Sequence, residues 1–184
     1  MKQREIDLNE ERTLLETLDR LVRSEKIRAA LEPIVARVRA DLARKKDARM
    51  AWEPVPLEIF GTLPPSIRSA WVFILRAGAD TGAERHPNSH QRMMTFAGTG
   101  DMKTDTKGAP NAIESESDIV WQSNLLVDDP GAPLQQRWIS IPKNVWHRPV
   151  IPNREDWVVI SFHTVAAETL VEERPGDKQM VYFH

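Results

Sequence analysis

The stretch GADTGAERHPNSHQRMMTFAG, residues 78–98, carries the pattern that decides the fold. It places polar side chains around a turn, between two runs of strand-like composition. Because side chains two apart on a strand share a face, Glu84 and His86 are expected to point the same way. Gln91 and Met93 then lie on one face of the returning strand, and His90 and Arg92 take the other face. One strand therefore offers a carboxylate and an imidazole, and its neighbour offers an amide.

The spacing of these residues resembles the first motif of the cupin family. The matching anchors are Gly78, Glu84, His86, Gln91 and Gly98. The family usually has histidine at the position of Glu84 and glutamate at the position of Gln91, so two anchors have changed type. The likeness is fairly specific because all five anchors keep their register.

A second stretch, PKNVWH at residues 142–147, is similar to the second cupin motif. Pro142 and His147 match that motif, and Asn144 stands where the family has glycine. Asparagine tolerates the left-handed backbone that a tight turn requires, so this exchange is physically mild. The family's later asparagine is out of register, because Asn153 comes two residues late.

The resemblance covers roughly residues 70–165. It implies a mainly β fold, a cupin jelly-roll β-barrel preceded by an N-terminal helical segment. It also implies a metal ion held inside the barrel by Glu84, His86, Gln91 and His147. Two imidazoles and one carboxylate suit non-haem Fe(II), with the amide oxygen as a weak fourth ligand. Fe(II) is therefore the favoured divalent metal, and Mn(II), Ni(II) and Zn(II) stay open.

The alternative to a metal is an inert barrel in which Glu84 and Gln91 form a hydrogen-bonded pair and His86 is a satisfied core histidine. A buried carboxylate without a cation or a strong donor costs a few kcal/mol or more. This cost favours metal binding over the inert barrel.

Other residues are second choices for the metal or for a pocket. His90 could replace Gln91 as a ligand if the turn shifts by one residue, although it shares a face with Arg92. His163 lies at the end of a strand-like run and could line the barrel mouth or act as a structural hydrogen-bonding residue. Arg76, Arg92 and Arg148 are candidate partners for a substrate carboxylate. A pocket suited to a small, partly apolar molecule is expected to be lined by Arg76, Met93, Trp146 and Phe162.

The chain is predicted to divide into a helical segment, residues 1–50, and a barrel domain, residues 51–184. Apolar side chains recur at helical spacing on both sides of a brief break at residues 24–26. Pro33 is expected to kink the second helix or to start a new one. Residues 101–117 are polar and predict a long loop. Short runs bounded by turn residues predict strands at 57–60, 70–76, 92–97, 119–127, 137–141, 157–165 and 180–183.

The composition of the chain excludes several classes of function. Lysine and arginine number 25 against 27 acidic residues, so no excess of positive charge favours nucleic acid or an anionic membrane. The chain contains no cysteine, which excludes disulfides, thiolate metal sites and cysteine nucleophiles. Neither a secretory signal nor a membrane-spanning run is recognisable, so a cytoplasmic protein is expected. The resemblance implies a homodimer.

Three functions from different classes remain open. The first is an Fe(II)-dependent, dioxygenase-like enzyme acting on a small organic molecule. The second is a metal- or ligand-binding sensor module without turnover, in which the N-terminal helices dock onto a partner. The third is a metal-free isomerase or epimerase that uses His147 or His86 as a base. The substrate itself cannot be inferred from the fold.

Overall fold

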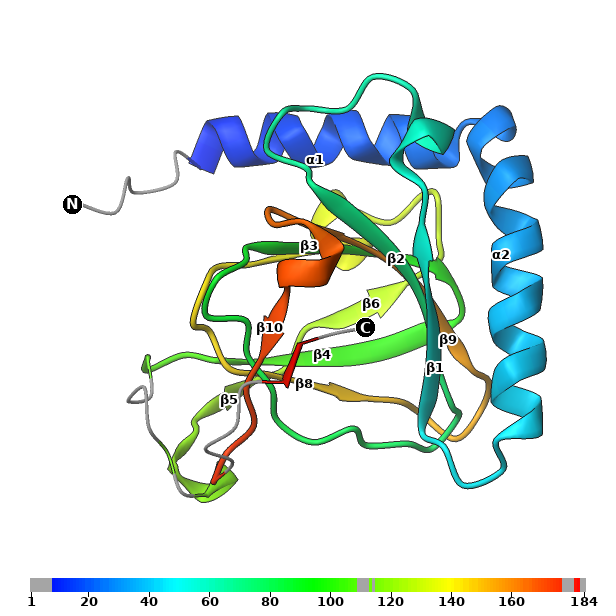
Figure 1. Ribbon diagram of the computed structural model, residues 1–184. Helices are drawn as coiled ribbons and strands as arrows, with labels where there is room; N and C mark the ends of the chain where they lie inside the picture. Colours follow the sequence, from blue (N-terminus) through cyan, green and yellow to red (C-terminus); the bar gives the residue numbers. More distant parts are fainter. Residues whose placement is uncertain (1–7, 109–112, 114, 177–180, 183–184) are drawn as a thin grey trace.

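The computed structural model describes residues 8–108, 113, 115–176 and 181–182. Two helices come first, and a body of antiparallel strands follows (Figure 1). The structure confirms the expected architecture, which is mainly β with a helical segment in front of two facing antiparallel sheets. No helix among the described residues is long and apolar enough to cross a membrane.

The helices α1 (Leu8–Arg23) and α2 (Glu25–Arg44) meet at Ser24, where a break was expected. Ser24 caps α2, because its hydroxyl oxygen accepts the N–H of Ile27. Pro33 does not start a new helix, since α2 runs through it. Apolar side chains on both sides of this proline are buried in the core, and their burial offsets the hydrogen bond that proline cannot donate.

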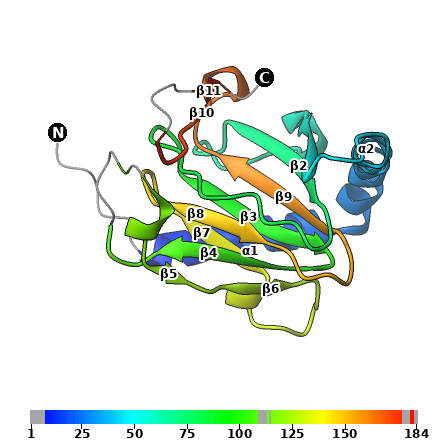
Figure 2. The ribbon, with the colours of Figure 1, turned by 90° about the horizontal axis from the view of Figure 1, so that it is seen from below.

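The strands form two antiparallel sheets that face each other, seen from below in Figure 2. The larger sheet has the order β1-β2-β9-β3-β7. In the smaller sheet, β4 pairs with β8 at one edge and with β6 and β5 at the other. A separate ribbon pairs β10 with β11. The bounds of the strands are β1 Met50–Val55, β2 Ser69–Leu75, β3 Gln91–Ala97, β4 Thr99–Asp105, β5 Trp121–Gln122, β6 Leu125–Val127, β7 Trp138–Ile141, β8 His147–Val150, β9 Trp157–His163, β10 Val171–Glu172 and β11 Val181–Tyr182.

The larger sheet is buried on both faces, and β9 shows the two environments. Val158, Ile160 and Phe162 share an apolar cluster with the helices. Trp157 and Val159 point the other way and pack with residues of the smaller sheet. A strand that is covered on both faces reads as a continuous apolar run, as this one does. The space between the two sheets is the interior of the barrel.

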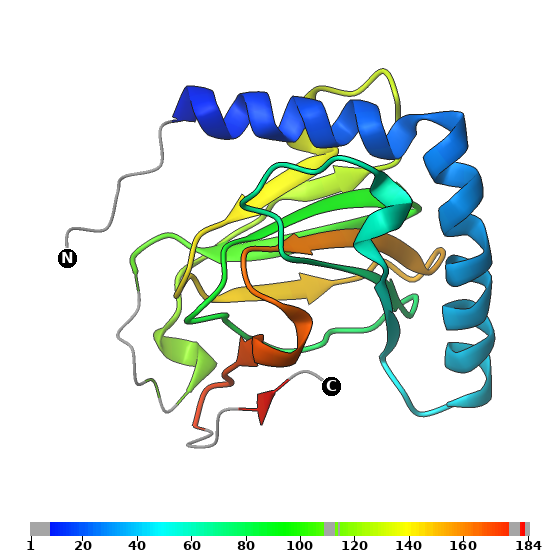
Figure 3. The same cartoon turned by 45° about the horizontal axis from the view of Figure 1, so that its top comes forward.

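The helices are fastened to the larger sheet by buried polar contacts as well as by apolar packing. Figure 3 shows α1 and α2 along two adjoining sides of the sheet. Glu11 on α1 accepts two hydrogen bonds from Arg92 on β3, each of 2.7 Å. Asp19, also on α1, accepts the indole N–H of Trp138 at 2.8 Å. Helices and sheet thus share one core, while the division of the chain at residue 50 stays a prediction.

Two expected elements near the barrel differ in the structure. Residues Leu57–Phe60 form a short 3-10 helix instead of a strand, because Pro56 precedes them and Gly61 follows in a left-handed conformation. The run expected at 119–127 is not one strand but two short ones, β5 and β6.

The long loop expected at 101–117 is wrong at its start, since most of β4 lies there. Because most residues of β4 are polar, the sequence did not predict a strand here. The inner face of β4 is made by Gly100 and Met102. A side chain at Gly100 would overlap the Trp157 ring, because an added Cβ would lie 2.0 Å from the indole. The large Trp157 side chain therefore fills the space that glycine leaves. The ends of the strand expected at 180–183, and His184, lie outside the described residues.

Candidate metal centre

The two motif segments meet at a short antiparallel bridge between Glu84 and His147. The N–H of Glu84 donates to the carbonyl of His147 at 2.8 Å, and the N–H of His147 donates to the carbonyl of Glu84 at 2.8 Å. The segment around Glu84 thus runs beside β8, which pairs with β4 at its other edge. Backbone pairing therefore brings one residue of each motif together inside the barrel.

The turn before β8 depends on the left-handed residue that the sequence predicts. Asn144 has a φ of 65°, and its N–H donates to the carbonyl of His86 at 3.1 Å. The N–H of Val145 donates back to the carbonyl of Pro142 at 3.3 Å and closes the turn. Asparagine thus performs the role expected of glycine, and it also ties the second motif to the first.

Glu84, His86 and His147 form a group that can hold a metal ion. One ligand atom from each lies within 4.8 Å of the others, and both histidines are buried. The Nδ1 of His86 lies 2.9 Å from the carbonyl of Val171, and the Nδ1 of His147 lies 3.1 Å from the carbonyl of Val145. Because a carbonyl only accepts, each Nδ1 carries the proton, and each Nε2 keeps a free lone pair.

Two buried acceptor atoms in the barrel have no hydrogen-bond donor among the described residues: the Nε2 of His147 and the Oε1 of Gln91. The Nε2 of His147 also lies 3.4 Å from the Oε1 of Glu84, which is itself an acceptor. Acceptors that face one another in a buried site need a positive charge between them. The donor set, which is nitrogen and oxygen without sulfur, suits a divalent transition metal.

The charges around the group keep Glu84 ionised. Burial alone would raise the pKa of Glu84, but its contact with His147 and the positive charge of Arg174 outweigh this and lower it. Arg174 donates to the Oε2 of Glu84 at 2.8 Å. Burial, with help from His147, lowers the pKa of His86 to about 4, so this imidazole is neutral near pH 7. An ionised carboxylate beside a neutral imidazole is the protonation state that metal binding requires.

Two residues of the group, Glu84 and His86, line a cavity of about 30 Å³ between the sheets. At about 10–15 Å³ for each water, the cavity has room for an ion and a water rather than for an organic molecule. Its apolar wall includes Phe73, Met93 and Val159. Leu170 and Glu172 cover it from the C-terminal segment.

Sequence reasoning missed the contribution of this C-terminal segment. Glu172 is buried, and burial, with Glu84 nearby, raises its pKa to about 7. Arg174 donates to both carboxylates, since its Nε lies 2.8 Å from the Oε1 of Glu172. The backbone carbonyl of Val171 orients His86. These residues lie outside both motifs, so no spacing signal could have found them.

The candidates for a pocket lie in different places. Met93 lines the cavity. Phe162 lies on the opposite face of the larger sheet, against Trp138. Trp146 lies in a separate apolar cluster, with the guanidinium of Arg85 over its ring. The expected pocket roles of Phe162 and Trp146 are therefore corrected, because strand alternation and the turn before β8 direct both side chains away from the cavity.

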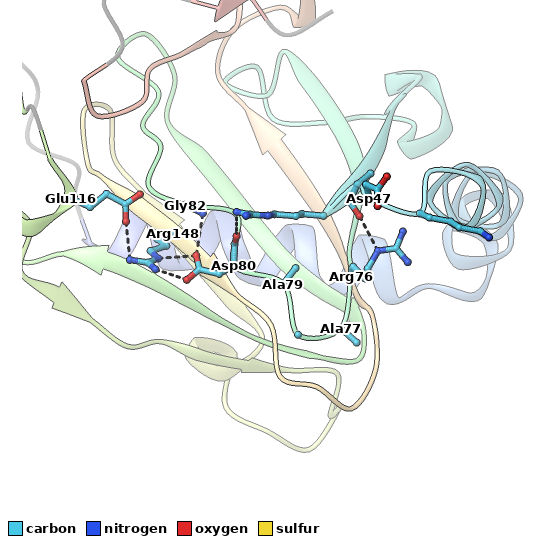
Figure 4. Close-up of a pocket in the computed structure, with 12 residues that line it drawn as sticks. Asp47, Arg76, Ala77, Ala79, Asp80, Gly82, Glu116 and Arg148 are labelled. Atoms are coloured by element: carbon cyan, nitrogen blue, oxygen red, sulfur yellow. Dashed lines mark hydrogen bonds and ion pairs between the residues drawn. The ribbon is translucent and has the colours of Figure 1, made fainter.

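The three arginines considered as carboxylate partners are all engaged elsewhere. Arg76 caps the C-terminal end of α2, donating to the carbonyls of residues 42, 45 and 48. Arg92 is bound to Glu11 on the outer face of the sheet. Arg148 lies between Asp80 and Glu116 in a surface groove of about 620 Å³, separate from the cavity, and Figure 4 shows this pairing.

The two second-choice histidines occupy opposite faces of the larger sheet. His90 lies on the outer face, where its Nε2 is 2.6 Å from the Oγ of Ser140 and 3.6 Å from Glu11. His163 lies in the interior and lines the cavity, with its ring centroid 5.2 Å from that of His86. Both ring nitrogens of His163 contact serine hydroxyls, so neither is a free ligand atom.

No family model matches the chain, and no curated protein sequence matches it. Solved structures similar to it include the capsular polysaccharide assembling protein CapF from Staphylococcus aureus, with a TM-score of 0.48 and 15% identity over 67% of this chain and 28% of that one. Lactobacillus farciminis oxalate decarboxylase, in a formate complex, has a TM-score of 0.47 and 10% identity over 68% and 31%. Procruciferin, an 11S globulin from Brassica napus, has a TM-score of 0.47 and 15% identity over 70% and 28%.

The chain spans roughly 30% of the length of these proteins. At these identities and TM-scores the similarities carry no argument about this chain, and what those proteins bind or assemble does not carry over. The topology and the donor atoms of this chain define its class: a barrel of two facing antiparallel sheets with a buried Glu–His–His group that can bind a metal ion.

Proposed function

We propose that this chain is a metal-dependent, dioxygenase-like enzyme that acts on a small organic molecule, with Fe(II) as the favoured metal. One observation carries the proposal: the buried Nε2 of His147 has no donor and lies 3.4 Å from the Oε1 of the ionised Glu84. Mn(II), Ni(II) and Zn(II) are the alternatives that the same donor set admits.

Each residue of the site would have a distinct part. Glu84, His86 and His147 would hold the metal, and Gln91 would supply a weak fourth oxygen. Fe(II) bound there would supply reactivity toward dioxygen, since two imidazoles and a carboxylate leave coordination positions open. The chain itself fixes both imidazoles through backbone carbonyls.

The cavity supports a small substrate that is partly apolar. Its apolar wall would bind a hydrocarbon part, and its polar end would face the metal. A cavity of about 30 Å³ admits no such molecule as it stands, so we propose that the side chains of Leu170 and Glu172 swing outward on binding. The backbone of this segment would stay in place, because Glu173 pairs with Arg85 and the carbonyl of Val171 contacts His86.

The test uses nitric oxide as a probe of an open coordination position, because no substrate is needed. Protein loaded anaerobically with one equivalent of Fe(II) is exposed to nitric oxide and examined by electron paramagnetic resonance. The oxygenase proposal predicts the S = 3/2 signal of an iron–nitrosyl species. A protein that binds Fe(II) but gives no such signal has a closed coordination sphere, and the oxygenase proposal then fails.

Two other functions are separated by simple measurements. A metal-free isomerase would retain its activity in chelator, whereas the proposed enzyme loses it. A sensor module would need helices free to dock onto a partner, but α1 and α2 bury their apolar faces on their own sheet. A homodimer and a cytoplasmic location remain part of the proposal. Light scattering tests the homodimer by measuring the molar mass in solution.

A further inference from the structure

His163 lies among the candidate ligands without offering a ligand atom. Its side chain is buried, and its ring stands edge-on to that of His86 at an interplanar angle of 87°. Its Nδ1 lies 3.3 Å from the Oγ of Ser89, and its Nε2 lies 3.0 Å from the Oγ of Ser161. Ser161 in turn accepts the side-chain N–H of Gln91 at 3.0 Å. Four buried polar side chains therefore form one continuous chain of hydrogen bonds.

The backbone contacts of Ser89 decide which group donates in each of these hydrogen bonds. The N–H of Thr164 donates to the Oγ of Ser89, and the hydroxyl of Ser89 donates to the carbonyl of His90. The single hydroxyl proton of Ser89 is used in that hydrogen bond. The Nδ1–H of His163 must therefore donate to the Ser89 oxygen. The Nε2 of His163 consequently accepts, and the hydroxyl of Ser161 donates to it.

The direction at Ser161 decides how the amide of Gln91 is turned. Because the Ser161 proton points to His163, the Ser161 oxygen can only accept from Gln91, and it takes the NH₂ group. The Oε1 of Gln91 is then left on the other side of the amide, buried and without a donor.

We propose that His163 is a positioning residue that acts through Ser161 to turn the amide of Gln91, so that oxygen and not NH₂ faces the metal. This inference rests on the proposed metal site. The orientation matters because the two ends of an amide have opposite electrostatic character, and an NH₂ group directed at a cation would repel it. The family resemblance places glutamate at this position, and either oxygen of a carboxylate can face a metal. Because glutamine has only one oxygen, it would need His163 to orient its amide.

The comparison with glutamate supplies the test. His163→Phe removes the acceptor, so that the hydroxyl of Ser161 is free to donate to the Oε1 of Gln91 and to hold it away from the metal. Ser161→Ala removes the partner of the NH₂ group, and it serves as a second variant if the first folds poorly. Each is made in the natural chain and in Gln91→Glu, and Co(II) affinity is measured by competition with a chelating indicator.

We expect both variants to lower Co(II) affinity about tenfold in the natural chain, as outer-shell partners of metal ligands do, and to change it less than twofold beside Gln91→Glu. The d–d absorption of bound Co(II) should shift in the natural background and not in the Gln91→Glu background. Equal losses in the two backgrounds would show that His163 only supports the fold, and the inference would be overturned.

A second measurement reads the amide without any metal. In protein with ¹⁵N-labelled glutamine, the side-chain signal of Gln91 is identified by its absence in Gln91→Glu. One of its two protons should exchange slowly with solvent, and this protection should vanish in Ser161→Ala. Fast exchange in the natural chain would contradict the inference, even if Co(II) binds. A natural chain that shows the protection but binds no Co(II) would instead contradict the metal site.

Discussion

Glu84 and His147 are joined twice: their backbones exchange two hydrogen bonds of 2.8 Å, and their side chains bring Oε1 within 3.4 Å of Nε2. The backbone pairing fixes which residue of one motif faces which residue of the other. The side-chain approach leaves two acceptors facing each other in a buried place, which is a strained arrangement without a cation. The backbone pairing that joins the two motifs therefore also brings the two candidate ligands together.

Arg174 is expected to support the metal site from outside it. Arg174→Met removes the donor to the Oε2 of Glu84, and the freed carboxylate should weaken metal affinity about tenfold. Isothermal titration with Mn(II) measures the change. Arg148→Met is the matched control, because Arg148 also bridges two carboxylates, Asp80 and Glu116, but in the surface groove and not in the cavity. An equal loss in both variants would refute a specific role for Arg174.

The buried ion pair of α1 is expected to contribute strongly to stability. Glu11→Gln leaves the guanidinium of Arg92 buried without its counter-charge, and the free energy of unfolding should fall by about 3 kcal/mol. Glu16→Gln, on the same helix, breaks an exposed pair with Arg12 and should change it by no more than about 0.5 kcal/mol. Urea denaturation compares the two variants. Equal effects would mean that the Glu11 pair does not hold the helix to the sheet.

The stability of the metal-free protein should depend on pH through its buried histidines. Burial, with Arg92, lowers the pKa of His90 to about 4, whereas an unfolded histidine titrates near pH 6.5. Between these values the unfolded chain binds more protons, so the free energy of unfolding falls as the pH falls from about 6.5 to 4. Each such histidine should contribute about 2 kcal/mol between pH 7.5 and 5.

Urea denaturation at these two pH values measures this loss. His90→Gln removes one titrating group while keeping an amide donor toward Ser140, so the pH dependence should become shallower by about one histidine's share. His86, whose pKa burial also lowers to about 4, still titrates in this variant. An unchanged pH dependence in His90→Gln would show that His90 is not held neutral in the folded protein.

Strand periodicity made the faces of β3 predictable from the sequence. Gln91 and Met93 were expected on one face and Arg92 on the other, and the structure has them so, since Gln91 and Met93 line the cavity and Arg92 binds α1. The left-handed Asn144 was predictable for a similar reason, because few residues adopt that backbone. Local geometry alone sets both features.

Features that depend on the path of the whole chain were not predictable. The strand β4 has a polar sequence, and only the Trp157 ring above Gly100 explains its buried face. Arg174 reaches Glu84 from 90 residues further along the chain. No periodicity or motif spacing in the sequence indicates that the C-terminal segment returns to cover the site.

Metal content tests the central claim most directly. Protein purified without chelator and offered Fe(II), Mn(II), Ni(II) or Zn(II) is analysed for bound metal in the natural chain, His86→Ala, His147→Ala and the control His90→Gln. The account predicts about one ion per chain in the natural protein and the control, and none in the two alanine variants. A natural chain that takes up no metal, or one whose metal survives in His147→Ala, would contradict it.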